Sequence, residues 1–262
     1  MSHISYSAFK IWNECPHKHK LSYIDRIRGF EGNEYTAFGT ALHSVCEVAL
    51  TNEDLDTKAH FQEQFLEQLK ALPENIRGNL NKPLVSDMRT QGDNLAPLAI
   101  PALKSFFKDF EVVSVEEQLF EPIKEYVDKE FDFKGFIDLV IKTPDGKYHI
   151  LDWKTCGWGW RPNKKSDAMT TYQLTFYKHY FAQKHNIDPN NIETYFALLK
   201  RTAKKDNVEI FRVTSGKKKT ENALNLLNKA LHNIKKNFHP KNRSACQTPF
   251  GMCEFSNTEH CS

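Results

Sequence analysis

The segment GFIDLVIKTPDGKYHILDWKT, residues 135–155, places two aspartates inside apolar runs. The TPDGK stretch between the runs is a turn signal, because proline suits the first central position of the turn and glycine its left-handed position. A hairpin closed there pairs Thr143 with Lys147, so the numbers of paired residues sum to 290. Asp138 and Asp152 are then expected to lie directly opposite each other, with Cβ atoms about 4.5–5.5 Å apart.

The predicted pair of carboxylates needs a partner. Alternation along the strand puts Lys154 on the same face as the acids and Trp153 on the other face. Neighbouring buried carboxylates repel each other and lose hydration, so one must take up a proton or a cation must lie between them. A divalent metal ion between the two carboxylates removes their repulsion and replaces their lost hydration. Mg²⁺ suits this position, since it favours one or two carboxylates together with waters and phosphate oxygens. The alternative is an Asp–Lys–Asp ion cluster on a solvated face, which the apolar neighbours on both strands disfavour.

Composition limits the class of protein. The chain has 262 residues, enough for one large domain or two small ones, with 40% hydrophobic and 26% charged residues, as in soluble globular proteins. No apolar run approaches the ~18 residues that span a bilayer, and the N-terminus has no secretory pattern. We therefore expect a cytoplasmic protein (host cytoplasm if viral) with no membrane partner. The net charge of +3 leaves nucleic-acid binding to local basic runs.

Hydrophobic periodicity predicts an α/β fold, a sheet with helices packed on it. Helices are expected at 5–24 (interrupted at Pro16), 38–50, 56–72, 97–110, 170–185 and 220–238. Strands are expected at 112–123, 131–142, 148–155, 194–201 and 208–214, where the period changes to two. The helix that carries His43 is expected to be capped at Gly39–Thr40.

Several motifs occur together in the order of a known family. These are SYSAFKIWNECPHKHKLSYI, FGTALHSVCE, GFIDLVI, ILDWKT and YQLTFYKHYF. The chain resembles the PD-(D/E)xK nuclease superfamily, in its RecB-like exonuclease form, similar to the CRISPR-associated adaptation nucleases and the nuclease domains of helicase-nucleases. The similarity runs from about residue 5 to residue 261, with gaps at 52–110 and in the loops. This chain departs from the family pattern in two places: its second acid, Asp152, is Asp rather than the commoner Glu, and no proline precedes its first acid, Asp138.

The resemblance implies a restriction-endonuclease-like mixed central sheet flanked by helices. It implies one nuclease domain over 1–262, with a helical N-terminal insertion or cap at 52–110, a catalytic sheet core at 112–215 and a Cys-rich C-terminal staple at 240–262.

The resemblance also implies site residues. The implied ligands of Mg²⁺ or Mn²⁺ are His43, Asp138, Asp152 and the backbone carbonyl of Trp153. Lys154 is implied as catalytic, and Gln173 and Tyr177 as groups near the site, one helical turn apart. Taken without the motif, His43 would be a packed or solvated helical histidine, and the last two would be packing residues. Glu47, one turn from His43, is either a hydrogen-bond partner of His43 or a surface acid. Nothing in the spacing decides whether Glu116 or Glu117 extends the acidic site.

Six cysteines contain no CxxC pair, and without a signal sequence a disulfide framework is not expected. Cys46 belongs to an apolar stripe, and Cys156 follows the DWKT strand. The resemblance implies that the remaining four hold a [4Fe–4S] cluster that joins the ends of the chain; they are Cys15, Cys246, Cys253 and Cys261. Six and then seven residues separate the last three, a looser spacing than in many relatives. Unligated thiols and a zinc site are the alternatives.

The predicted function is metal-dependent hydrolysis of DNA by an exonuclease acting on single strands or ends. The expected settings are recombination, repair, or phage or CRISPR DNA processing, with a helicase or recombination factor as a possible protein partner. Basic runs at 161–167, 199–205 and 216–220 suit phosphates, and Trp158 and Trp160 are either base contacts or structural. The alternatives are a non-catalytic DNA-binding or assembly subunit, and an endonuclease acting on flaps, junctions or RNA.

Overall fold

The hairpin that carries the two aspartates is present in the computed structural model. The structure describes residues 2–27, 29–126, 131–248 and 251–261. Strand β3 (Phe131–Lys142) pairs antiparallel with β4 (Tyr148–Cys156), and the numbers of paired residues sum to 290. The turn is closed by the Thr143 N–H, which donates to the Lys147 carbonyl at 3.0 Å, and Gly146 takes the left-handed conformation with φ +85°. The predicted register is confirmed.

The chain divides into two units. The first unit consists of Met1–Glu31, Leu119–Gly135 and Gly216–Ser262, and the second of Gly32–Gln118 and Phe136–Ser215. Strands β2 (Glu111–Pro122) and β3 contribute residues to both units and pair with each other.

The sheet of the second unit has the strand order β3-β4-β5-β6. Strand β5 (Ile192–Lys200) runs parallel to β4, and β6 (Val208–Val213) runs antiparallel to β5. The connection from β4 to β5 contains α8 (Pro162–Ser166), α9 (Ala168–His185) and the short 3₁₀ helix η3 (Pro189–Asn191). A parallel pair requires such a long crossover, because a tight turn can join only antiparallel neighbours. The sheet is therefore mixed, as predicted.

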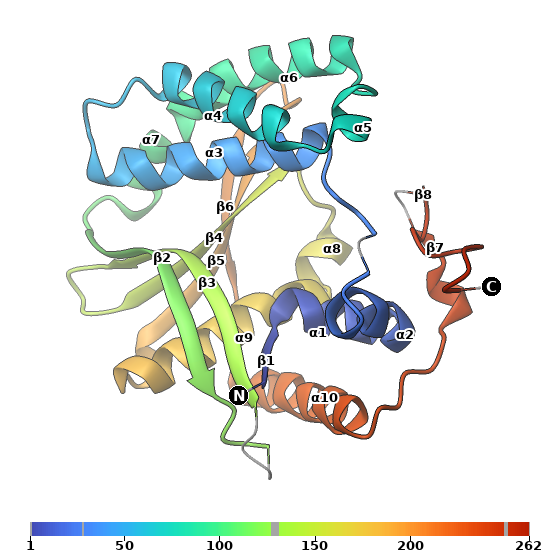
Figure 1. Ribbon diagram of the computed structural model, residues 1–262. Helices are drawn as coiled ribbons and strands as arrows, with labels where there is room; N and C mark the ends of the chain where they lie inside the picture. The colour runs from blue at the N-terminus through green and yellow to red at the C-terminus, as the bar shows by residue number, and fades with distance from the viewer. Residues whose placement is uncertain (1, 28, 127–130, 249–250, 262) are drawn as a thin grey trace. The chain divides into compact units, whose positions relative to one another are not determined.

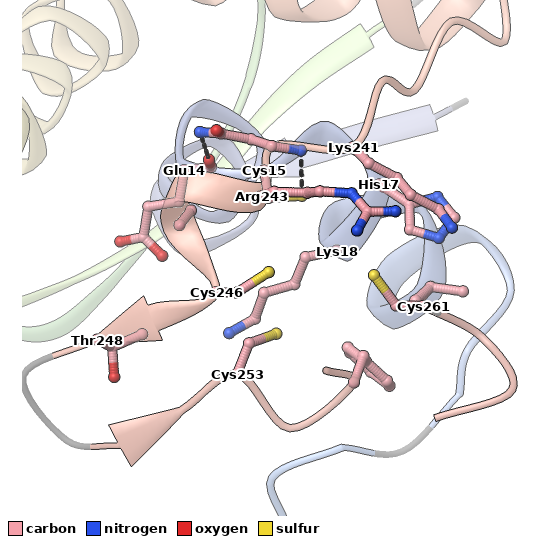
Figure 2. A pocket seen from close by; sticks show the side chains of 14 residues that line it. Glu14, Cys15, His17, Lys18, Lys241, Arg243, Cys246, Thr248, Cys253 and Cys261 are labelled. Carbon is pink, nitrogen blue, oxygen red and sulfur yellow. Dashed lines mark hydrogen bonds between the residues drawn. The ribbon is translucent and has the colours of Figure 1, made fainter. Parts of the chain in front are cut away.

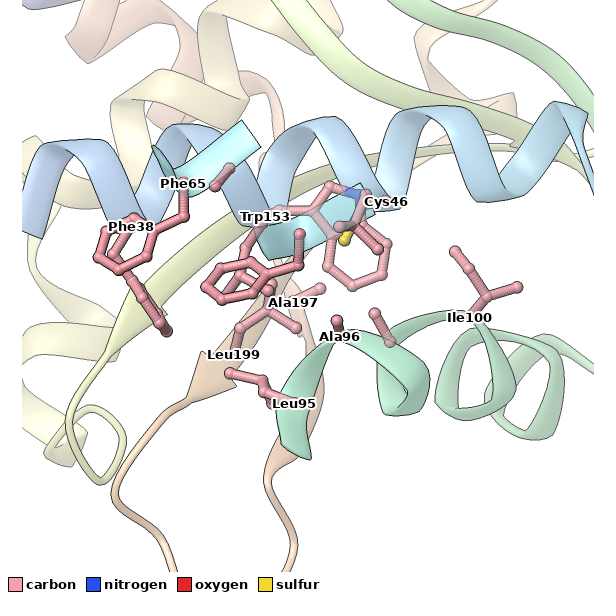
Figure 3. Close-up of a cluster of buried hydrophobic side chains, with 14 of the residues drawn as sticks. Phe38, Cys46, Phe65, Leu95, Ala96, Ile100, Trp153, Ala197 and Leu199 are labelled. Carbon is pink, nitrogen blue, oxygen red and sulfur yellow. The ribbon is translucent and has the colours of Figure 1, made fainter. Parts of the chain in front are cut away.

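Helices cover both faces of this sheet (Figure 1). On one face lies α3 (Glu34–Thr51), and the buried side chains of β4 and β5 on that face, Trp153 among them, belong to its apolar cluster (Figure 3). On the other face lies α9, whose Gln173 bonds to Asp152 of β4. Gly39 of α3 allows close contact with the sheet, since a Cβ there would lie 3.2 Å from the Thr155 hydroxyl.

The segment predicted as a helical insertion, 52–110, is helical. Its helices are α4 (Thr57–Ala71), α5 (Glu74–Arg77), α6 (Lys82–Leu95), the 3₁₀ helix η2 (Ala96–Leu98) and α7 (Ala99–Phe107). Phe61 and Phe65 of α4 and Met88 of α6 are buried in the same cluster as the inner face of α3. The segment thus extends the core of the second unit.

The first unit contains a short parallel strand pair and the two ends of the chain. Strand β1 (Ser2–Ser5) pairs with the first residues of β3. The other elements are α1 (Tyr6–Glu14), α2 (Pro16–His19), the π-helix η1 (Lys20–Ile24), α10 (Lys217–Lys235), the 3₁₀ helix η4 (Arg243–Ala245) and the hairpin of β7 (Gln247–Thr248) and β8 (Gly251–Met252). Ser5 caps α1 by accepting a hydrogen bond from the Ala8 N–H at 3.2 Å.

One local expectation was wrong, and one strand was not predicted. The helix with His43 begins at Glu34 rather than at Gly39–Thr40, because Asn33 and Thr36 form a capping box one turn earlier. Residues 2–5 form strand β1, because β3 supplies hydrogen-bond partners that cannot be predicted from the local sequence. Among the helices that the structure describes, none is long and apolar enough to cross a membrane.

Candidate active site

The paired aspartates have different hydrogen-bond partners. Asp152 is buried, with 1% of its surface exposed, and its Oδ1 accepts a hydrogen bond from Gln173 Nε2 at 2.7 Å. Asp138 Oδ2 accepts a hydrogen bond from the Trp153 backbone N–H at 2.7 Å. This bond crosses from β3 to β4 beside the second acid, so both carboxylates lie at one point of the sheet.

Burial raises the pKa of Asp138 well above its usual value, and the charge of Asp152 raises it further. The Lys154 ammonium and the Trp153 N–H oppose this shift without cancelling it. The first acid is therefore the one that resists ionisation when no cation is near, as expected for adjacent buried carboxylates.

Lys154 lies beside Asp152, and its Nζ forms an ion pair with Asp152 Oδ2. On the far side of Asp152, Gln173 Nε2 also donates to the Tyr177 hydroxyl at 3.1 Å. Asp152 is thus held between a lysine on its own strand and a glutamine on α9. The predicted proximity of Gln173 and Tyr177 to the acid pair agrees with these contacts.

His43 comes to the acids from α3. Its Nδ1 lies 3.5 Å from Asp138 Oδ2, and its ring is hydrogen-bonded to the Trp153 backbone. Burial lowers the pKa of His43, which the negative charge of Asp152 only partly offsets. A neutral imidazole has a lone pair for a metal, so His43 is in the protonation state of a ligand.

The adjacent Glu116 and Glu117, which the sequence left undecided, have different surroundings. Glu117 on β2 bonds to Lys184 at 2.6 Å and to His185 at 2.7 Å, both on α9. Glu116 instead faces the acids: burial raises its pKa, and so do the charges of Glu47 and Asp152. Its backbone has φ +50°, rare for a residue with a side chain. Strand alternation predicts that Glu116 and Glu117 point to opposite sides of β2, but it does not say which of the two sides faces the acid pair. Only the folded structure decides that.

The donor set at this point fits a divalent metal. Two carboxylates, an imidazole and a backbone carbonyl are hard or intermediate ligands of the kind that Mg²⁺ and Mn²⁺ accept. Within the described part of the chain, no three His, Cys, Asp or Glu side chains stand close enough together to hold an ion as they are. At the acid pair, the Lys154 ammonium is paired with Asp152 Oδ2 and the Trp153 N–H donates to Asp138 Oδ2.

A second cluster lies in the first unit, where four cysteines line one pocket (Figure 2). They are Cys15, Cys246, Cys253 and Cys261. The Cys253 N–H donates to the Cys246 carbonyl at 2.7 Å, and the Asn242 N–H donates to the Cys15 sulfur at 3.4 Å. Lys18 enters the pocket near Cys253 and bonds to Glu254 at 2.9 Å. All six cysteines of the chain are free thiols.

Comparison with known proteins gives a family match over nearly the whole chain. The model of the PD-(D/E)XK nuclease superfamily matches residues 3–258. Among solved structures, a candidate exonuclease from Eubacterium rectale matches with a TM-score of 0.55 and 11% sequence identity, over 98% of this chain and 86% of that one. The protein SSO0001 matches with a TM-score of 0.38 and 14% identity, over 92% of this chain and 91% of its own. Among curated proteins none matches. The first similarity concerns the fold, and the second is too weak to support an argument.

Proposed function

The chain belongs to the PD-(D/E)XK nuclease superfamily, and from this premise we propose that it hydrolyses DNA phosphodiester bonds with Mg²⁺ or Mn²⁺ as an exonuclease. One observation carries the proposal: β3, β4 and α3 bring the buried Asp152 carboxylate, the partly buried Asp138 carboxylate, a lysine and an imidazole to one point of the sheet. A purely structural sheet gains nothing from such a pair, because the repulsion between the acids weakens the fold.

The proposed metal ligands are His43, Asp138, Asp152 and the Trp153 carbonyl. When bound, the ion supplies neutralisation of phosphate charge and a water of lowered pKa. Gln173 fixes the orientation of Asp152 through its 2.7 Å hydrogen bond, and Tyr177 in turn accepts from Gln173. Such supporting contacts keep ligand carboxylates in place.

Lys154 is the proposed catalytic cation. Its ammonium stands beside Asp152, where it can orient the attacking water and stabilise negative charge on the phosphate oxygens. The oxygen of the attacking water bonds to phosphorus and the water releases a proton, while the bond from phosphorus to the leaving oxygen breaks and that oxygen takes up a proton. Because Lys154 would contact the reacting atoms while Gln173 acts through its hydrogen bond to Asp152, their substitutions are expected to affect the rate by different amounts.

The test uses end-labelled linear single-stranded and duplex DNA, and circular DNA, with Mg²⁺, Mn²⁺ or EDTA. The expected result is metal-dependent release of label from linear DNA, no nicking of circles, and loss of activity in Lys154→Met. Lys104→Met is the matched control, because Lys104 is an exposed lysine of α7 paired only with Glu53. Cleavage of circles would replace the exonuclease by an endonuclease. Binding without cleavage by the wild type would leave a DNA-binding or assembly subunit.

We further propose that the four cysteines of the first unit hold a cofactor, a [4Fe–4S] cluster in preference to zinc. The proposal is supported by their common pocket, which brings Cys15 together with three residues from the far end of the chain. Thiolates suit either an iron–sulfur cluster or Zn²⁺, and bridging distant segments would stabilise the unit. Iron, zinc and acid-labile sulfide per chain, with visible absorption, distinguish the cofactors. Cys253→Ser should lose the signal, and Cys156→Ser, on β4 in the second unit, should keep it.

A further inference from the structure

The loop after β4 carries two tryptophans in different environments. The Trp160 ring packs against Phe196 and Phe211, with ring centroids 5.0 and 6.2 Å apart. Trp158 is 82% exposed, the highest exposure among the large apolar side chains of the described residues. Lys164 stands 4.5 Å from the centre of the Trp160 ring. Trp160 therefore anchors the loop, and Trp158 projects into solvent from an anchored backbone.

This loop is fixed to the turn that follows β5. The Arg201 N–H donates to the Cys156 carbonyl at 2.9 Å, and the Thr202 N–H donates to the Gly157 carbonyl at 3.1 Å. These bonds continue the parallel pairing of β4 with β5 beyond the last strand residues. The exposed Lys204 and Lys205 lie in the same turn, so Trp158 has cationic neighbours on the adjacent connection.

A second aromatic ring joins this surface from α3. The Arg201 guanidinium lies 5.2 Å from the centre of the Tyr35 ring, and its Nη1 donates to Gln91 Oε1 at 2.7 Å. Tyr35 is 49% exposed, in the first turn of α3. One turn later, Gly39 meets Thr155 of β4. The stacked Arg201–Tyr35 pair therefore lies beside the base of the Trp158 loop.

The surface is strongly positive. Residues 157–165 and 201–206 together contain six Lys or Arg and one acid, Asp206. Glu209 occupies two nearby lysines, Lys165 and Lys200. A planar apolar side chain among cations matches a polyanion with exposed rings, whereas an apolar protein partner would gain nothing from the cations.

The distance to the candidate active site is short. Trp158 follows Lys154 by four residues, at most about 13 Å of extended chain. Tyr35 precedes His43 by eight residues of one helix, about 12 Å along its axis. Stacked bases are about 3.4 Å apart along a strand, so a base at this surface would be a few nucleotides from a phosphate at the acid pair.

We propose that Trp158, with the Arg201–Tyr35 pair and Lys204 and Lys205, forms a stacking site for an unpaired base of single-stranded DNA. The proposal rests on the proposed nuclease function and names its substrate as the single strand. In a duplex the two faces of each base are covered by the neighbouring bases. Trp158 can therefore stack on a base only when the strand is unpaired and a face of that base is exposed.

The test measures binding and cleavage separately. Binding of fluorescent oligothymidylate and of a blunt duplex of equal length is measured in EDTA for the wild type, Trp158→Ala, Trp158→Phe and Leu66→Ala. Leu66 is an exposed apolar residue of α4, 52% exposed, and serves as the matched control. Loss of one stacked base weakens binding about 5- to 100-fold. We expect that loss for the single strand in Trp158→Ala, partial recovery in Trp158→Phe, and wild-type binding in the control.

The outcomes separate the two proposals. In Mn²⁺, Trp158→Ala is expected to raise KM on single strands with kcat nearly unchanged. Wild-type affinity in Trp158→Ala, alongside normal cleavage, would overturn the stacking site and leave the nuclease standing. The stacking site would also be overturned if Trp158→Ala weakened the binding of duplex and single-stranded DNA by the same factor. Displacement of the oligonucleotide from the wild type by polyglutamate as readily as by unlabelled oligonucleotide would overturn it too. Trp158-dependent binding by a wild-type protein that never cleaves would overturn the nuclease function and retain the site.

Discussion

Neutralising Asp138 should stabilise the protein when no divalent ion is bound. Asn keeps the oxygen that accepts the Trp153 N–H, so Asp138→Asn removes charge while leaving the shape and this 2.7 Å bond in place. Two unit charges about 5 Å apart repel by roughly 3 kcal/mol at an effective dielectric constant of about 20. The Lys154 ammonium offsets part of this repulsion.

A net gain of about 1–2 kcal/mol in the free energy of unfolding remains, which corresponds to a rise of about 2–8 °C in Tm for a chain of this size. The gain must depend on pH, because the pKa of Asp138 is raised in the folded state. The folded wild type holds a proton that the unfolded chain releases, so its stability falls as pH rises from about 3.9, the unfolded value, through the raised folded value. Asp138→Asn should thus match the wild type near pH 4 and exceed it at neutral pH.

The assay is thermal unfolding in EDTA and in Mn²⁺, across that pH range, with Asp152→Asn as the isosteric contrast. Asp152→Asn should show no gain, because it takes the partner from Lys154. Mn²⁺ should raise the Tm of the wild type and leave that of Asp138→Asn unchanged. A lower Tm for Asp138→Asn at neutral pH in EDTA, or a gain that persists at pH 4, would refute the argument from repulsion.

Four further substitutions test separate parts of the second unit. Lys154→Met should lower kcat by about 10²–10³-fold with DNA affinity retained, as measured by single-turnover cleavage beside binding in EDTA; an unchanged kcat would remove Lys154 from the chemistry. Gln173→Leu should lower activity or Mn²⁺ affinity by about 10–100-fold, and Tyr177→Phe by less, because Tyr177 acts only through Gln173. Gly92→Ala should destabilise by about 1–3 kcal/mol, because its Cβ would lie 2.0 Å from the Phe61 ring. Denaturant unfolding checks this against the exposed Asn94→Ala on the same helix, and equal midpoints would contradict it.

The sequence predicts the hairpin well because its register is a local property. A two-sided constraint acts there, as the turn residues fix which residues pair and the apolar pattern fixes which side faces inward. The proximity of Asp138 and Asp152 follows from these constraints: the ladder pairs Leu139 with Leu151, and just beyond it the Trp153 N–H donates to Asp138 Oδ2. The pairing needs no knowledge of the rest of the chain.

The remaining features depend on contacts between distant segments. Strand β1 exists because β3 offers it a partner, and the sequence pattern assigned no element to residues 2–4. Glu116 and Glu117 are adjacent, and only the packing of α9 against β2 assigns Lys184 and His185 to one of them. Trp158 and Trp160 are likewise two residues apart, and the position of Phe196 on β5 decides which ring packs against the sheet.

The distribution of these groups over the two units predicts how the cysteines act. Every residue of the candidate active site lies in Gly32–Gln118 or Phe136–Ser215, whereas the four pocket cysteines belong to the other unit. A cofactor there would add ligand bonds between Cys15 and the C-terminal segment, and such bonds act on the stability of the unit that contains them. Loss of the cofactor should therefore appear first as unfolding or proteolysis of the first unit. A direct part in the chemistry would instead require a lower kcat in a Cys253→Ser protein whose thermal stability is unchanged.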